Sequence, residues 1–270
     1  MFMMSMLFLL SYSRHIKFTT IELLDSREKE EIKKALATVH KTYKKAGFHV
    51  SSYIMNNEFE ILRQYIEKNF LTHIEVCAAN DHVLDAERRI WVVKKQVQSA
   101  YDVPPFKHVP LLLFVELVCV CVFWLKYFPN KKGISDRIGP IEIMTNMKLD
   151  LNKITKIAYG DYAQVHQKTV TNSMESRMVA VICLGPSVNV NVSYRWYSLY
   201  SGKVLYRIQF TSLPMPIDVI HWIEYMTKIL GHTQELTFHE RKMDNIEEKS
   251  LLAMGRMVPY TKTHHCKYTK

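Results

Sequence analysis

The stretch Arg195–Tyr200 interleaves cationic and aromatic side chains, a combination suited to holding a polyanion. It lies within Met147–Thr211, where eight basic residues stand against three acidic ones. Basic side chains neutralise phosphates, and aromatic rings among them are typical of nucleic-acid-binding surfaces. We therefore expect Arg195, Trp196 and Lys203 to contact a nucleic acid.

Positive charge is also a property of the whole chain. Its 270 residues include 36 lysines and arginines against 26 aspartates and glutamates, a net charge of +10 at pH 7. A second basic segment, Arg27–Lys45, has seven basic and three acidic residues. That segment is equally well interpreted as the solvated face of a helix, since Glu30 and Lys34 lie one helical turn apart. The overall balance favours DNA or RNA as the partner.

The sequence gives little support for a nucleotide cofactor or a zinc site. The chain has only eight glycines and contains neither GxGxxG nor GxxxxGK[ST], so we expect no small-molecule cofactor. The nearest candidate for a zinc site, His264-His265-Cys266, has adjacent residues that cannot easily face one ion. The five cysteines are an odd number, and four of them lie in apolar stretches, as in proteins of a reducing compartment. We therefore expect an intracellular protein.

The first half of the chain alternates strand and helix signals. Period-2 and short apolar runs predict strands, whereas apolar residues three and four apart predict helices. The expected strands are a buried pair in Met1–Leu10, then His15–Leu23, Phe48–Met55 and Ile74–Ala79. The expected helices are one capped by Asp25 or Ser26 and ended by Gly47, then Phe59–Phe70 and Val83–Ala100. The first has an apolar stripe at Ile32, Leu36, Val39 and Tyr43. This order predicts an α/β layered domain.

Beyond Ile143 the pattern changes to short β-type runs. They are separated by turn signals and predict a small antiparallel sheet or barrel: Tyr162–His166, Met178–Leu184, Val192–Tyr200 and Val204–Phe210. A last helix is expected at Ile217–Leu230. We divide the chain into a domain at 1–146, a β-rich domain at 147–213, and a helix with a polar tail at 214–270.

One apolar segment, Pro110–Leu125, could be mistaken for a membrane anchor. It is 16 residues long, contains Glu116 and is followed by Lys126. Because a helix needs about 20 apolar residues to cross a bilayer, the segment is better interpreted as a core helix. We therefore expect no membrane association, with an anchor at 110–125 as the alternative.

Several motifs, in order along the chain, resemble the integrase region of copia-type retrotransposon polyproteins. Residues 79–90, ANDHVLDAERRI, are similar to the family's ADEHVPEIERQI, and residues 55–60, MNNEFE, to its MDNEFE. The match continues through Trp124–Pro129, Gly133, Ser135, Pro140, Ile143–Thr145, Tyr159–His166, Ile182–Pro186 and Ser201–Lys203. The resemblance spans roughly residues 1–240. No part of the sequence resembles the family's N-terminal His/Cys zinc region.

The resemblance implies an RNase H-like mixed sheet flanked by helices and incomplete at its N-terminus, followed by the small antiparallel β-rich domain. It also implies a DDE polynucleotidyl transferase, in which three carboxylates hold two Mg²⁺ or Mn²⁺ ions. In this sequence Glu87 corresponds to the family's glutamate and would be the one remaining metal ligand.

The chain departs from the catalytic pattern at the other two positions. The family's second aspartate falls on Asn56, whose amide carries no negative charge. By the resemblance, the first aspartate either falls upstream of Met1 or has been lost. The nearby acids Glu58, Asp81 and Asp85 could be proposed as substitutes, but metal geometry tolerates little displacement. The sequence therefore resembles a truncated, degenerate integrase that is catalytically inactive. Lys126, where the family has Asn, is a further departure.

The surviving activity that we expect is binding of DNA or RNA through backbone charge, in a chain that can oligomerise. Arg88, Lys94 and Lys95, on the helix that begins near Glu87, join the nucleic-acid-binding set. Two alternatives remain open beside the membrane anchor: an active metal-dependent polynucleotidyl transferase or nuclease, and the product of a pseudogene with no function.

Overall fold

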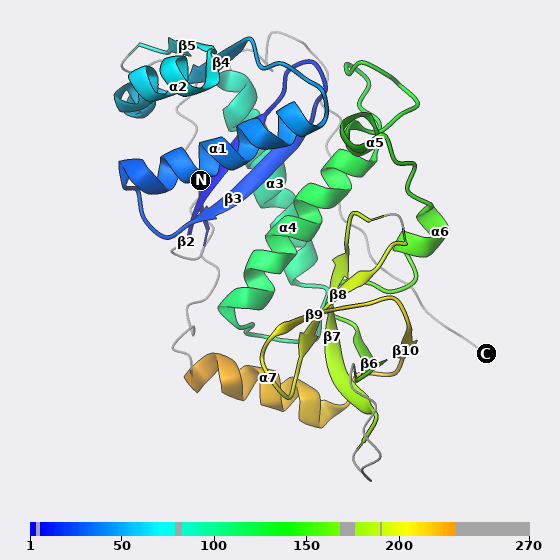
Figure 1. Ribbon diagram of the computed structural model, residues 1–270. Helices are drawn as coiled ribbons and strands as arrows, with labels where there is room; N and C mark the ends of the chain where they lie inside the picture. The colour runs from blue at the N-terminus through cyan, green and yellow to red at the C-terminus, as the bar shows by residue number, and fades with distance from the viewer. Residues whose placement is uncertain (4–5, 79–82, 168–175, 190, 230–270) are drawn as a thin grey trace, which may run out of the picture. The chain divides into compact units, whose positions relative to one another are not determined.

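The computed structural model describes residues 1–3, 6–78, 83–167, 176–189 and 191–229, all within one compact unit that spans Met1–Leu236 (Figure 1). The fold is mixed α/β and includes a small antiparallel sheet, as the sequence predicts. Part of the expected polar tail, 230–270, lies outside the described residues, as do Asp81 and the His264-His265-Cys266 run.

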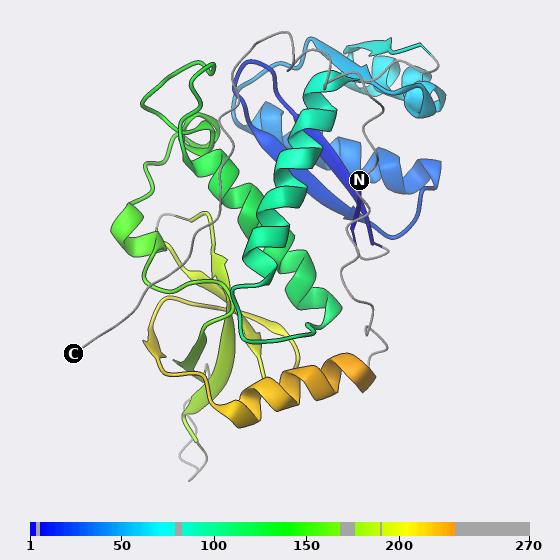
Figure 2. The ribbon, with the colours of Figure 1, turned by 180° about the vertical axis from the view of Figure 1, so that it is seen from behind.

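The N-terminal strands form an antiparallel sheet in the order β1-β2-β3, with bounds β1 Phe2–Met3, β2 Met6–Tyr12 and β3 Thr19–Leu24. Alternate β2 side chains enter different clusters: Phe8 packs with Val93 and Val97, whereas Leu9 packs with Leu36. Helices α1 and α3 accordingly cover opposite faces of this sheet (Figures 1 and 2). The predicted strand at His15–Leu23 begins later, because Lys17 has a left-handed backbone in the turn that precedes β3.

Helix α1, Lys29–Lys45, follows the predicted pattern. Leu36, Val39 and Tyr43 of the expected apolar stripe are buried, and Gly47 has a positive φ of 79° just after the helix. The N-cap is Glu28 rather than Asp25 or Ser26. The Ser26 hydroxyl instead accepts a hydrogen bond from the Glu28 backbone N–H at 3.2 Å, so it stabilises the turn before the helix.

A separate parallel pair consists of β4, Ser52–Met55, and β5, His73–Val76. Between them lie the 3-10 helix η1, Asn57–Leu62, and helix α2, Arg63–Phe70. No backbone ladder joins this pair to β2 within the described residues, so the expected single mixed sheet is divided into two. Side chains of β2, β4 and β5 nevertheless share one hydrophobic cluster with α1.

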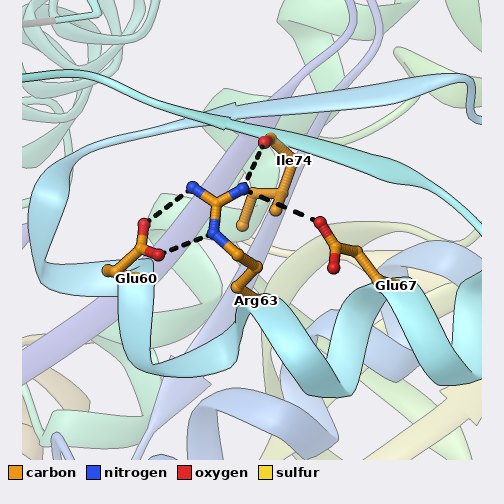
Figure 3. A network of polar contacts seen from close by, with 4 residues as sticks. All are labelled: Glu60, Arg63, Glu67 and Ile74. Carbon is orange, nitrogen blue, oxygen red and sulfur yellow. Dashed lines mark hydrogen bonds and ion pairs between the residues drawn. The ribbon is translucent and has the colours of Figure 1, made fainter.

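The outer edge of β5 is covered by Arg63 (Figure 3). Its guanidinium donates to the backbone carbonyl of Ile74 at 3.1 Å and makes two hydrogen bonds to Glu60, at 2.6 and 2.9 Å. Glu67 lies 3.7 Å away on the other side. A charged side chain on an edge carbonyl discourages pairing with another strand.

Two long helices form the centre of the described unit. Helix α3 spans Leu84–Tyr101 and helix α4 spans Leu111–Tyr127, close to the predicted bounds. Eight residues of α4 are buried, among them Phe114, Leu117 and Val118, which confirms the core helix. None of the helices in the described ranges is long and apolar enough to cross a membrane.

The β-rich part contains a five-stranded antiparallel sheet in the order β10-β6-β7-β8-β9. The strand bounds are β6 Tyr162–His166, β7 Met178–Pro186, β8 Tyr194–Ser198, β9 Val204–Arg207 and β10 Phe210–Ser212. The sheet curls, so that strands that are not neighbours in it come together. The ring of Phe210 in β10 lies 5.0 Å, centroid to centroid, from that of Trp196 in β8. Two short helices, α5 Pro140–Thr145 and α6 Leu151–Ile154, precede it, and α7, Ile217–Ile229, follows.

One hydrophobic cluster joins elements from both halves of the chain. It unites buried residues of β2, α3 and α4 with Ile182, Leu184 and Tyr197 of the β-rich sheet and Ile223 of α7. The sequence does not reveal this shared packing. The domain boundaries at 146/147 and 213/214 stay predictions.

Candidate functional site

Glu87 lies in the first turn of α3 and is half-buried. Two residues before it, Asp85 forms an ion pair with Arg14 at 2.8 Å, which fixes the start of α3 beside the turn between β2 and β3. Both side chains of that pair are about half exposed. The pair leaves Asp85 engaged with a cation rather than directed to a metal ion.

Asn56 directly follows β4 and is the N-cap of η1. Its side-chain oxygen Oδ1 is buried and accepts no hydrogen bond from the described residues. Glu58, two residues on, is exposed. Burial lowers the pKa of the Met1 ammonium, and the negative charge of Glu58 offsets part of that lowering. The end of β4 therefore carries an amide where the resemblance expects a carboxylate.

In the part of the chain that the structure describes, no group of three or more His, Cys, Asp or Glu side chains lies close enough together to hold a metal ion. The Mg²⁺ or Mn²⁺ that the resemblance implies remains an expectation.

The exposed face of α3 carries a stripe of cationic and aromatic side chains. Arg88, Trp91 and Lys95 are spaced three and four residues apart, so they lie on one side of the helix. Trp91 is 53% exposed, and the Lys95 ammonium lies over its ring, 4.2 Å from the centroid. Lys94 is half-buried beside this stripe. Trp91 is not among the residues expected from the sequence, although its helical spacing from Arg88 and Lys95 places it on the same face.

Arg89, the next residue after Arg88, has a structural role. Its Nε donates to the Thr19 hydroxyl at 2.7 Å, and Nη2 donates to the Leu125 carbonyl at 3.4 Å. The guanidinium also lies over the Tyr12 ring, 5.2 Å from the centroid. These contacts join α3 to the β2–β3 sheet and to α4, and so hold the Arg88 stripe in place.

The three predicted β-sheet residues have different surroundings. Trp196 is fully buried and donates its indole N–H to the Arg207 carbonyl at 3.3 Å, so its ring offers no surface for stacking on a base. Arg195 is mostly buried and forms an ion pair with Glu116 of α4 at 2.5 Å. Of this group Lys203 alone is exposed. Trp196 and Arg195 are buried because of the way the sheet curls and packs. One face of β8 is enclosed by the curled sheet, and the other face packs against α4.

Comparisons with known proteins add no relative. No protein family model matches the sequence, and no curated protein is significantly similar to it. The function is therefore inferred from the residues and their geometry.

Proposed function

We propose that this chain is an integrase-like, intracellular nucleic-acid-binding protein with an RNase H-like core, which holds DNA through its phosphate backbone. We propose further that it does not cut or join strands. The binding is attributed to the Arg88, Trp91 and Lys95 stripe on α3, with Lys94 beside it.

The arrangement of elements supports the RNase H-like part of the proposal. The three antiparallel strands, the helix α1 and the parallel β4–β5 pair follow one another in the order expected of a mixed sheet flanked by helices. Strands β2 and β4 contribute to one hydrophobic cluster without sharing a backbone ladder.

The α3 stripe is the observation that carries the binding proposal. Exposed cations neutralise phosphates and release counterions, and an exposed indole adds a stacking surface. The stripe is held rigidly, because the buried Arg89 fixes the helix from the opposite side. A rigid cationic helix face suits a regular phosphate backbone.

Asn56 is the reason to propose that catalysis is absent. A neutral amide cannot balance the charge of two divalent ions as a carboxylate does. Glu87 by itself provides too few ligands for a two-metal centre.

The binding proposal is tested by titrating a labelled DNA duplex with the chain at several salt concentrations. We expect affinity to fall at least about tenfold between about 50 and 200 mM salt. The double variant Arg88→Glu/Lys95→Glu should weaken binding and reduce the salt slope by about 2. A control with the same charge change, Lys41→Glu/Lys44→Glu, alters exposed residues of α1, which covers the opposite face of the β2–β3 sheet.

Affinity that is independent of salt, or absent at low salt, would contradict the proposal. Equal loss in the α3 and α1 variants would remove the stripe as the binding face. The enzyme alternative is examined with the same DNA and Mn²⁺. Metal-dependent cleavage by the wild type that Glu87→Gln abolishes would overturn the inactive assignment.

A further inference from the structure

The outward side of α7 carries large apolar side chains that the proposed function does not use. Ile217, Tyr225 and Ile229 are 70%, 61% and 59% exposed, and His221 continues the same row at four-residue spacing. Ile223, on the opposite side of the helix, is fully buried in the cluster that includes residues of α4 and the β-rich sheet. The helix therefore presents apolar side chains to solvent as well as to the core, as interaction surfaces do.

Contacts on the inner side hold α7 in place. The Glu224 carboxylate accepts a hydrogen bond from the Lys107 backbone N–H at 3.1 Å. The buried Thr227 hydroxyl donates to the Ile223 carbonyl at 2.7 Å and lies 3.5 Å from the His108 carbonyl oxygen. Because the connection between α3 and α4 anchors the helix on this side, its outward side is formed before any partner binds.

The two charged groups on the outward side lie near opposite ends of the helix. Asp218 is in the first turn and Lys228 in the last, where each sign suits the helix dipole. Both side chains are exposed, and no hydrogen bond or ion pair among the described residues engages either charged group. This side therefore has no net charge, although the whole chain carries +10. It offers no excess of charge to a polyanion, and it lets two copies of a basic chain approach without repulsion at the contact.

An antiparallel pair of α7 helices would match the apolar side chains to one another. If the two-fold axis lies at the level of Ile223, Ile217 of one copy lies opposite Ile229 of a second copy, because both are six positions from the centre. His221 of one copy then lies opposite Tyr225 of the other, since both are two positions from it. Each of these pairs occurs twice, so apolar groups meet apolar groups along the whole helix.

The same symmetry pairs unlike charges. Asp218 of one copy lies opposite Lys228 of the second copy, since both are five positions from the centre, and the reverse pair forms at the other end. A parallel pair would instead bring aspartate to aspartate and lysine to lysine, which repel. The charges of this side therefore fit a second copy of the chain in the antiparallel orientation.

We propose that α7 is the surface through which two copies of this chain form a two-fold symmetric dimer, with the two helices antiparallel. The face of one 13-residue helix is smaller than the roughly 20–30 residues that each side of a standard interface contributes. The dimer is accordingly weak, with an expected Kd of about 1–100 µM. The proposal goes beyond nucleic-acid binding and does not depend on it, because no residue of the α3 stripe belongs to this surface.

The charge pairs are tested by sedimentation velocity of the full chain at about 1–200 µM, in about 150 mM salt, which screens the overall charge. Asp218→Lys and Lys228→Asp should each raise the dimer Kd about tenfold, because each places like charges opposite one another at both ends. The double variant Asp218→Lys/Lys228→Asp restores unlike pairs and should return the Kd to within about threefold of the wild type. An equimolar mixture of the two single variants should likewise dimerise.

Two controls separate the α7 face from general effects. Asp136→Lys makes the same charge change as Asp218→Lys at an exposed position between α4 and α5, and should leave the Kd unchanged. Ile217→Ser/Ile229→Ser should raise the Kd at least about tenfold through lost apolar contact. Leu71→Ser/Leu84→Ser removes side chains that are 82% and 78% exposed elsewhere, and should change the Kd less than about twofold. Thermal unfolding checks that each variant folds.

Three results would overturn the proposal. The first is a chain that stays monomeric up to about 200 µM, as it would if another segment or another protein covered this face. The second is a dimer whose Kd the α7 variants leave unchanged. The third is a loss in the single charge variants that the double variant does not recover. No nucleic acid is present in these measurements, so their failure leaves DNA binding at α3 untouched, and failure of DNA binding leaves the dimer untouched.

Discussion

The Arg195 guanidinium lies 2.5 Å from the Glu116 carboxylate and links β8 to α4 through two largely buried charges. Their side chains are only 19% and 16% exposed. Burial raises the pKa of Glu116, and the positive charge of Arg195 offsets part of that rise. Losing either partner leaves the other charge buried and unpaired.

We therefore expect Glu116→Leu or Arg195→Met alone to lower the free energy of unfolding by about 2–4 kcal/mol. The double variant Glu116→Leu/Arg195→Met should recover most of this loss, because apolar pairs of similar volume often replace buried ion pairs without cost. Urea denaturation of all four proteins measures the coupling. Additive losses would show that the two side chains act independently.

Lys126 should make stability depend on pH in the alkaline range. Its ammonium lies 5.1 Å from the Phe18 ring centroid, and burial lowers its pKa from 10.5 to about 8. Between those values the unfolded chain binds a proton that the folded chain has lost, so stability rises as pH rises. We expect Lys126→Met to be about 1 kcal/mol more stable than the wild type at pH 7. Thermal unfolding should show this difference narrowing from pH 8 to 10.5.

His40 should make stability depend on pH in the acidic range. Its ring stacks on Phe70 at 4.3 Å and shares a 3.2 Å hydrogen bond with the Tyr53 hydroxyl. Burial, and then the charges of Lys44 and His49, lower its pKa below 6.5. Because the unfolded chain takes up the proton first, stability falls as pH falls below 6.5 toward the folded pKa.

His40→Phe keeps the stacked ring and removes the titration. We expect the free energy of unfolding of this variant at pH 7 to be about 1 kcal/mol lower than that of the wild type, because the hydrogen bond is missing. The difference from the wild type should then shrink as the pH is lowered, as followed by urea denaturation. A constant difference at every pH would contradict the assigned role of His40.

Two glycines should respond differently to substitution. Gly139→Ala places a Cβ against the Tyr127 carbonyl, so we expect the free energy of unfolding to fall by about 1–3 kcal/mol. Gly139→Asn should be at least as harmful. Gly47 has open space around it but a φ of 79°, so Gly47→Ala should cost about 1 kcal/mol and Gly47→Asn clearly less. Thermal unfolding of the four variants distinguishes steric exclusion from backbone strain.

Much of the secondary structure follows from local patterns. The apolar stripe that ends at Tyr43, the glycine at 47 and the alternation in β2 depend on neighbours within one or two turns or strand positions. The same local reasoning places Arg88 and Lys95 on one face of a helix. The spacing of Trp91 from both residues puts it on that face as well, but only the tertiary structure shows that the face is exposed.

What the sequence by itself determined is the series of elements, the basic charge and the amide at Asn56, since each depends on residue type or short-range spacing. Only the tertiary structure decided which cations and rings are available to a partner. Strand alternation puts Arg195 and Trp196 on opposite faces of β8, but both faces are buried, one inside the curled sheet and one against Glu116. Burial of this kind arises from contacts between segments far apart in the chain, which local patterns do not encode.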